Sequence, residues 1–256
     1  MEKSYYLAKM TWQEVGSRLD ECDIVLLPIG STEQHGPALP LDNDHFVAGR
    51  FASMSADRLW DDIKVTVAPT IAYGYSPHHM EFKGTVTLQE STLANVIVDV
   101  CSSLAQHGFT KIVLVNGHGG NGTAISNALH ILRDMGSAKV YHIDWWAMAS
   151  DKIEEVATKP VFHGCDMETS VSWYLGQRVL EDRRVDEPGR DLVPGFIGAD
   201  MADTGMRINT TWSMKEISDS GVVGYSTKAT KKKGEQVAEV VVDRIVSFIR
   251  EIAGQK

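Results

Sequence analysis

Hydrophobic and polar positions along the chain follow two patterns in turn. Short apolar runs that end in glycine or a charged residue are typical of buried strands, and longer segments with the period of a helix are typical of amphipathic helices. The short runs predict strands over 23–30, 64–70, 111–117 and 138–146, and the longer ones predict helices over 44–60, 91–109, 121–136, 167–180 and 231–253. This alternation indicates βαβ crossovers and predicts an α/β fold with a mostly parallel central sheet covered on both faces.

Capping and stop residues place some of the helix ends. Ser91 is predicted to cap its helix, and Gly108 and Gly136 are predicted to end theirs. The segment 181–225 has little periodicity and is rich in Asp, Gly, Pro and Thr. Loops of this length inside a compact domain usually form a lid, a binding loop or an assembly contact. A variable surface excursion explains the composition equally well.

Composition and charge restrict the class of protein. The 256 residues are 43% hydrophobic and 23% charged, which is enough apolar material for a single domain over 1–256. A net charge of -9 argues against binding to nucleic acid or to an anionic membrane. The three cysteines show no C-x-x-C spacing, and the chain has no signal-peptide pattern and no apolar run of about 20 residues. These features predict a cytoplasmic protein.

The first predicted strand leads into a stretch rich in metal-binding side chains, GSTEQHGPALPLDNDHF over 30–46. In extended backbone, residues i and i+2 face the same side, so Glu33 and His35 can point into one pocket. Asp44 stands just before the next helix, where an N-cap carboxylate is the ordinary alternative. Because sites of parallel α/β sheets lie at the carboxyl ends of the strands, we expect these three residues to form part of a site.

The strand over 111–117 leads into NGHGGNG, residues 116–122. His118 follows the strand end and is a candidate metal ligand, and Asn121 is predicted to cap the next helix. The backbone N–H groups of Gly119 and Gly120 are expected to bind an oxyanion of the substrate. A phosphate-binding loop would carry a lysine, which this stretch lacks.

A third stretch, HGCDMETS over 163–170, contributes His163 and Glu168. Glu168 falls in the first turn of a predicted helix, where a carboxylate also interacts favourably with the helix dipole. A nitrogen and oxygen donor set without thiolate suits two divalent ions, Zn²⁺ or Mn²⁺, about 3.5–4 Å apart and bridged by a carboxylate. The candidate metal ligands are Glu33, His35, Asp44, His118 and Glu168.

Four stretches of the chain carry a resemblance to a known family: LLPIGSTEQHGPALPLDNDHFVA, HHMEFKGTVTL, VNGHGGN and HGCDMETS. With these motifs spread over nearly the whole chain, the sequence resembles the creatininase (creatinine amidohydrolase) family. The resemblance implies a three-layer α/β/α fold and a binuclear metal site that hydrolyses a non-peptide or cyclic amide. It also implies a homohexamer, the assembly of creatininase itself.

The same resemblance divides the ligands between two ions. It implies that Glu33, Asp44 and His118 bind one metal. It implies that His35, Asp44 and Glu168 bind the other, so that Asp44 bridges the two. In the predicted reaction Asp44 also accepts a proton from the attacking water.

Other positions are assigned by matching or departing from the family pattern. His163 matches the family's proton-handling histidine, and Trp145 or Trp146 falls near an aromatic residue that closes the creatininase pocket. Gly120 stands where creatininase has an additional glutamate ligand, and Lys159 stands where it has a lid tryptophan. These two departures argue against creatinine as the substrate.

Adjacent residues of a strand face opposite sides, so at most one of His78 and His79 is expected to reach the site. We favour His79 as a substrate contact. The predicted function is hydrolysis of a small-molecule amide, formamide, lactam or lactone, with no nucleic acid or membrane partner. The alternatives are a peptidase like the mycofactocin maturation protein, a lactone hydrolase, and a metal-stabilised binding protein without catalysis.

Overall fold

The computed structural model describes residues 4–194, 196–198 and 210–255. Its central sheet is parallel, with the strand order β2-β1-β3-β4. These strands are β1 (Ile24–Ile29), β2 (Thr66–Val67), β3 (Lys111–Asn116) and β4 (Lys139–Asp144). The predicted α/β class is confirmed, although β2 is much shorter than the predicted strand over 64–70.

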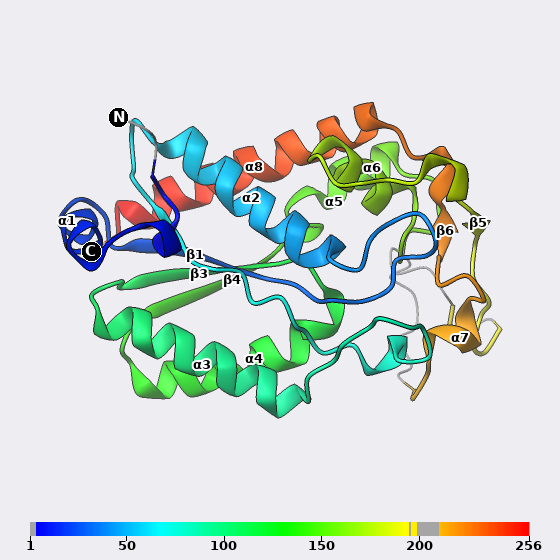
Figure 1. The fold of residues 1–256 in the computed structure, drawn as a ribbon, viewed down its shortest axis with the longest axis horizontal. Coiled ribbons are helices and arrows are strands. Elements are labelled where there is room, and N and C mark those ends of the chain that lie inside the picture. The colour runs from blue at the N-terminus through cyan, green and yellow to red at the C-terminus, as the bar shows by residue number, and fades with distance from the viewer. Residues whose placement is uncertain (1–3, 195, 199–209, 256) are drawn as a thin grey trace.

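Helices cover both faces of this sheet (Figure 1). Helices α2 and α8 lie over one face, and α3 and α4 lie over the other, so the architecture has three layers. The helices of the described residues are α1 (Trp12–Glu21), α2 (Asn43–Leu59), α3 (Glu90–Gln106), α4 (Gly122–Met135), α5 (Ser150–Val156), α6 (Asp166–Tyr174), α7 (Met214–Ile217) and α8 (Lys231–Ala253).

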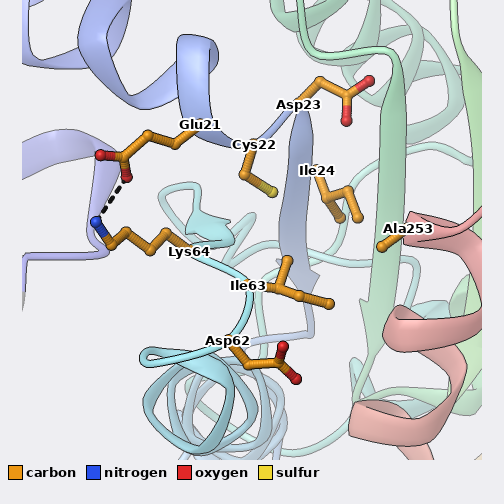
Figure 2. A pocket seen from close by; sticks show the side chains of 8 residues that line it. All are labelled: Glu21, Cys22, Asp23, Ile24, Asp62, Ile63, Lys64 and Ala253. Atoms are coloured by element: carbon orange, nitrogen blue, oxygen red, sulfur yellow. Dashed lines mark ion pairs between the residues drawn. The ribbon is translucent and has the colours of Figure 1, made fainter.

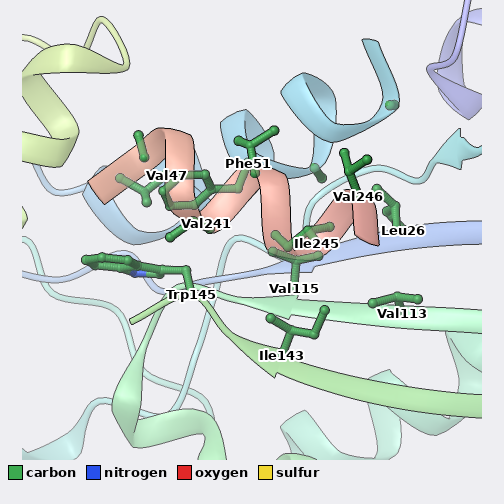
Figure 3. Close-up of a cluster of buried hydrophobic side chains, with 14 of the residues drawn as sticks. Leu26, Val47, Phe51, Val113, Val115, Ile143, Trp145, Val241, Ile245 and Val246 are labelled. Atoms are coloured by element: carbon green, nitrogen blue, oxygen red, sulfur yellow. The ribbon is translucent and has the colours of Figure 1, made fainter. Parts of the chain in front are cut away.

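Both faces of strand β1 are buried, as a central strand of a covered parallel sheet requires. Leu26 packs into the cluster beneath α2 and α8, and Leu27 packs into the cluster beneath α3 and α4. Figure 3 shows the first cluster, where Val241 and Ile245 of α8 lie against the sheet. The removal of these apolar side chains from water holds the three layers together.

Several helix ends differ from the prediction. Gln89, and not Ser91, is the N-cap of α3, because Ser91 already lies in the first helical turn. Helix α6 ends at Tyr174 instead of 180, because Gly176 adopts a left-handed conformation (φ +97) that a helix cannot continue through. Gly136 (φ +66) ends α4 as predicted.

The segment 181–225 contains little regular structure in its described part, in agreement with its composition. It includes α7 and two short antiparallel strands, β5 (Asp186–Glu187) and β6 (Gly224–Tyr225). These elements lie at the opposite end of the molecule from the two chain ends (Figure 1). Within the described ranges, none of the helices combines the length and apolarity needed to cross a bilayer.

Gly234 permits close packing of α8 against α6. A Cβ atom at this position would lie 1.9 Å from the carbonyl oxygen of Ser170, a backbone atom that cannot rotate away. We therefore expect Gly234→Ala to lower the free energy of unfolding by about 1–3 kcal/mol, the usual cost of overpacking, as measured by urea unfolding.

The matched control is Gly16→Ala in α1, where a Cβ atom would meet nothing within 4 Å. This control should leave stability unchanged or raise it by up to about 1 kcal/mol, because alanine favours the helix. A Gly234→Ala protein as stable as the wild type would contradict the close approach of the two helices.

Candidate metal centre

The chain turns back directly after β1 and brings its acidic residues together. The Glu33 N–H group donates to the Leu41 carbonyl (3.0 Å), and Gly36 adopts a left-handed conformation (φ +69) in the intervening turn. Helix α2 then begins with Asp42 as its N-cap, which puts Asp44 in the first turn. The expected N-cap position of Asp44 is therefore wrong by two residues, and its side chain is available to the cluster described next.

Ionisable side chains from separate segments converge at the carboxyl end of the sheet. His35 Nε2 lies 2.9 Å from Asp44 Oδ1 and 3.8 Å from Glu168 Oε1. His118 Nδ1 lies 3.2 Å from Glu33 Oε1 and 3.4 Å from Asp44 Oδ2. Asp44 therefore stands between two imidazoles and turns one oxygen toward each. The Glu168 side chain is 17% exposed, and the other four are almost completely buried.

Outer hydrogen bonds fix which nitrogen of each imidazole faces the carboxylates. His35 Nδ1 lies 3.2 Å from the Glu33 carbonyl oxygen, so its proton is directed there. His118 Nε2 lies 3.1 Å from the Tyr75 carbonyl oxygen and 3.1 Å from Ser76 Oγ. The remaining nitrogens, Nε2 of His35 and Nδ1 of His118, are left to face the centre. This arrangement is the usual outer support of histidine ligands in metal sites.

Several of the inward-facing atoms have no hydrogen-bond partner among the residues that the structure describes. They are both carboxylate oxygens of Glu33, Asp44 Oδ2 and His35 Nε2. Leaving buried charged oxygens unmatched is costly, and a cation is the partner that satisfies them. The donor atoms form groups close enough to hold a metal ion, namely Glu33 with Asp44 and His118, His35 with Asp44 and Glu168, and Glu33 with His35 and His163. The donor set therefore fits divalent metal ions.

Charge interactions within the cluster shift the ionisation of its members. Burial raises the pKa of Asp44, but His35 and His118 outweigh it and bring that pKa well below the usual range. Burial lowers the pKa of His35, but Asp44 and then Glu168 outweigh it and raise that pKa to about 10. Burial raises the pKa of Glu168 to about 7. Without a metal, positively charged imidazoles therefore balance the carboxylates.

His163 lies at the edge of this cluster, in the loop before α6. Its Nε2 lies 2.6 Å from the Gln34 carbonyl oxygen, and its Nδ1 lies 4.0 Å from Glu33 Oε1. Its backbone pairs with that of Val223, from the segment 181–225. The next residue, Gly164, donates its N–H to Glu168 Oε2 (2.5 Å), which turns the other oxygen of Glu168 toward His35.

Comparison with known proteins decides the family. The family model for creatininase, described as creatinine amidohydrolase, matches residues 8–249. The chain belongs to the creatininase family. A mycofactocin precursor peptide peptidase from Mycolicibacterium smegmatis is 35% identical over 87% of this chain and 84% of its own length. A 3-dehydro-scyllo-inosose hydrolase from Thermotoga maritima is 30% identical over 96% of this chain and 83% of its own.

Solved creatininase structures share the fold. One of them, named Creatininase Mn, matches with a TM-score of 0.79 and 28% identity over 97% of this chain and 98% of its own. The expected creatininase-like arrangement of a mostly parallel sheet between helices is thereby confirmed. Members of the family act as hydrolases under their given names, and this chain is a hydrolase of the creatininase family.

The glycine-rich loop over 116–122 is held by the side chain of Asn121. Asn121 was expected to cap α4, but its side chain makes no capping bond. It donates to the Gly30 carbonyl (3.0 Å) and accepts from the Tyr75 N–H (3.0 Å) instead. A Cβ atom at Gly120 would lie 2.3 Å from His118 Nε2, so a glutamate at this position would displace His118 in the present geometry. Gly119 is exposed, and a Cβ atom there would meet nothing within 4 Å.

One of the two tryptophans expected to contact substrate lies in the core instead. Trp145 is 4% exposed and packs on Phe51 in the hydrophobic core (Figure 3), with ring centroids 5.8 Å apart. Trp146 is half-buried against the same core. Sequence reasoning missed another aromatic residue, Trp212, at the border of the cluster. Trp212, from the segment 181–225, lies 4.9 Å from His78 between ring centroids, and the only signal for it was an aromatic residue in a loop-rich segment.

The pair His78 and His79 lies in a short 3-10 turn, not in a strand. The reasoning from strand alternation therefore does not apply to them. His79 is buried and its Nε2 lies 3.4 Å from Glu33 Oε1, whereas the His78 ring stacks on that of His118 at 5.9 Å. Both residues thus border the cluster, and His79 is the one directed at a carboxylate.

A separate cavity of about 400 Å³ lies at the other end of the strands. Figure 2 shows its lining, where Cys22 and Asp23 precede β1, Ile24 begins it, and Lys64 pairs with Glu21 (2.9 Å). The candidate metal ligands do not line it. Catalytic chemistry in parallel α/β sheets is expected at the carboxyl end of the strands, so we place the site at the acidic cluster.

The raised pKa of His35 predicts how stability depends on pH in chelator-treated protein. A histidine whose pKa is raised in the folded state contributes its full stabilisation at pH values below its ordinary pKa of 6.5. This contribution is lost as the pH rises through the folded pKa of about 10. We expect the free energy of unfolding to fall between these two pH values, and His35→Gln to reduce the fall, as measured by urea unfolding at several pH values.

The exposed His107 provides the control for this experiment. His107→Gln should keep the wild-type dependence on pH. A His35→Gln protein that loses as much stability as the wild type over the same range would show that His35 is not charged in the folded state.

Proposed function

We propose that this chain is a binuclear metal-dependent hydrolase that cleaves a C–N bond of a small amide, formamide or lactam. The observation that carries the proposal is the position of Asp44, whose oxygens lie 2.9 Å from His35 Nε2 and 3.4 Å from His118 Nδ1. Glu33, Asp44 and His118 would hold one ion. His35, Asp44 and Glu168 would hold the other, with Asp44 as the bridge.

The proposed ions are Zn²⁺ or Mn²⁺, because the donors are carboxylate oxygens and imidazole nitrogens without thiolate. A solved relative named Creatininase Mn supports manganese. When bound, two such ions would polarise a substrate carbonyl and lower the pKa of a water molecule. The protein groups around them then have to orient the substrate and move its protons.

We assign proton transfer to His163. Burial lowers the pKa of His163 to about 3, so this imidazole is neutral at pH 7. Its Nε2–H group donates to the Gln34 carbonyl, which leaves Nδ1 unprotonated and directed toward Glu33. An imidazole in this position can pass a proton to the departing nitrogen. Asp44 is the proposed acceptor of the proton from the attacking water, because it belongs to both ligand groups.

The substrate side of the site is proposed from the residues that border the cluster. The N–H groups of Gly119 and Gly120 are the proposed oxyanion contacts, and His79 is the proposed neighbour of the reacting group. Lys159 and Gly120 argue against creatinine, because the lid tryptophan and the additional glutamate of creatininase are absent.

A peptide-processing activity is the second candidate function. It is favoured by the 35% identity to the mycofactocin precursor peptide peptidase. A lactone hydrolase differs only in the bond that is cleaved. A homohexamer is proposed from the resemblance to creatininase, and sedimentation velocity of the purified protein tests it.

Metal removal and a ligand substitution test the proposed function. Chelator treatment should abolish turnover of a panel of amides, formamides, lactams, lactones and short peptides, and added Zn²⁺ or Mn²⁺ should restore it. His118→Ala should lower kcat/KM at least about 100-fold, because it removes a proposed ligand of one ion. Metal content measured by mass spectrometry should fall in the same variant.

Glu154→Gln, an exposed change on α5, is the matched control and should keep both metal and activity. Undiminished turnover in chelator-treated protein would overturn the metal-dependent mechanism. Protein that holds two equivalents of metal yet turns over nothing in the panel would instead support the non-catalytic binding protein.

A further inference from the structure

Gln34 occupies an unusual place, between the candidate ligands Glu33 and His35 but with its side chain directed away from theirs. The side chain is buried and makes three hydrogen bonds. Its Oε1 accepts from the Gly36 N–H (2.9 Å), and its Nε2 lies 3.1 Å from the Gly221 carbonyl oxygen and 2.8 Å from His79 Nδ1. All the hydrogen-bonding atoms of this amide therefore face partners inside the protein.

These partners fix the orientation of the amide. A backbone N–H can only donate, so the atom that faces Gly36 must be the oxygen. A backbone carbonyl can only accept, so the atom that faces Gly221 must be the nitrogen. The second hydrogen of that nitrogen is directed at His79, whose Nδ1 must then be an acceptor. The tautomer of His79 thus follows from two backbone groups of known polarity.

With Nδ1 as an acceptor, the proton of the neutral His79 ring lies on Nε2. That nitrogen faces Glu33 Oε1 at 3.4 Å. Both oxygens of this candidate metal ligand are buried, and neither forms a hydrogen bond with a residue that the structure describes. Within the described ranges, His79 itself belongs to none of the groups of donor atoms that can hold an ion.

We propose that His79 is a positioning residue that acts through Glu33, and that the Gln34 amide fixes His79 in the Nε2–H form. In this form His79 directs its Nε2–H group at Glu33 Oε1, the oxygen that also faces His118 Nδ1, and so orients a carboxylate that is a candidate metal ligand. His79 is thereby excluded as a ligand, because its inward nitrogen carries a proton. Only the expected effect on metal binding rests on the proposed metal centre, since the tautomer itself is a property of the chain.

The segment 181–225 completes this arrangement. The carbonyl that orients Gln34 belongs to Gly221 (φ +83), where a Cβ atom would lie 1.9 Å from Gln34 Oε1. The preceding residues are held by Glu187, which accepts from the N–H groups of Asp219 (2.8 Å) and Ser220 (2.9 Å). The loop that orients the amide is therefore itself anchored, which makes the tautomer a built-in feature of the fold.

Nitrogen NMR of histidine-labelled, metal-free protein tests the tautomer directly. His79 is assigned by comparison with His79→Gln, and long-range proton–nitrogen spectra show which ring nitrogen carries the proton. We expect Nδ1 to have the shift of an unprotonated nitrogen and Nε2 that of a protonated one. The reverse pattern, or a doubly protonated ring, would overturn the proposal whatever the enzyme hydrolyses.

Gln34→Glu tests the role of the amide. The carboxylate can only accept, so we expect His79 to move its proton to Nδ1 or to become doubly protonated. Gln106→Glu, the same change at an exposed position of α3, should leave the His79 spectrum unchanged. A folded Gln34→Glu protein, checked by circular dichroism, whose His79 keeps the wild-type tautomer would overturn the role of Gln34.

Metal retention tests the role toward Glu33. Truncation of a residue that orients a metal ligand typically lowers metal affinity about 10–100-fold, and we expect His79→Ala to do so in Zn²⁺ competition against a chromogenic chelator. His79→Gln should retain the wild-type affinity for Zn²⁺ within about 3-fold, because the glutamine amide can donate from the position of Nε2. This change is smaller than the one expected when the contact is lost. His79→Asn is shorter and should resemble alanine. Equal affinity in all variants would overturn the positioning role, even if the proposed hydrolysis were established.

Discussion

Charge balance at the buried carboxylates is the constraint on which the rest of the site depends. Glu33 and Asp44 are 0% and 2% exposed, and an uncompensated charge at such depth costs several kcal/mol. In the protein alone, His35 and His118 provide the compensation by holding protons that they would not hold in water. Divalent cations would provide it more completely, because they would also satisfy the carboxylate oxygens that form no hydrogen bond with the described residues. Proton and metal therefore compete for the same imidazole nitrogens.

The carboxylates reach this depth because two glycines let α2 approach the sheet. A Cβ atom at Gly30 would lie 2.3 Å from the backbone nitrogen of His45, and one at Gly117 would lie 2.3 Å from the backbone carbonyl oxygen of Asp44. The first turn of α2 therefore fits between the ends of β1 and β3 only if both positions lack side chains. Asn121 then ties the neighbouring loops together through Gly30. The acidic cluster thus follows from close backbone packing as much as from its own side chains.

Sequence reasoning recovered the parts of the site that depend on local geometry. The alternation of extended backbone puts Glu33 and His35 in one cluster, and the strand-end rule brings His118 to it. The expectation for Trp145 failed because this residue lies just beyond the end of β4, where the strand no longer fixes the side that it faces. Its side chain faces the core, as does that of Ile143. The capping box of Thr11 and Glu14, which begins the unpredicted helix α1, was readable from the sequence.

What the sequence could not predict depends on contacts between distant segments. The hydrogen bond from Gln34 to Gly221 joins residues 187 positions apart, and no local pattern marks it. The pairing of His163 with Val223 is of the same kind. Both bonds reach into the segment 181–225, whose composition predicted only a loop. Long-range backbone contacts of this kind are fixed by the packed fold and not by the propensities of the residues that make them.

The division between locally determined residues and long-range contacts also separates the chemistry of the site from its choice of substrate. The candidate metal ligands lie in the segments that follow β1 and β3 and in the first turns of α2 and α6, directly beside the packed layers. Trp212, by contrast, comes from the segment 181–225, outside the parallel sheet, and it lies against His78 and Phe162 at the border of the cluster. Changes in that segment can alter what is bound without disturbing the ligands, provided that Gly221 and Val223 keep their backbone bonds. The different substrates in the names of the relatives agree with this division, because one arrangement of metal ligands can be bordered by different loops.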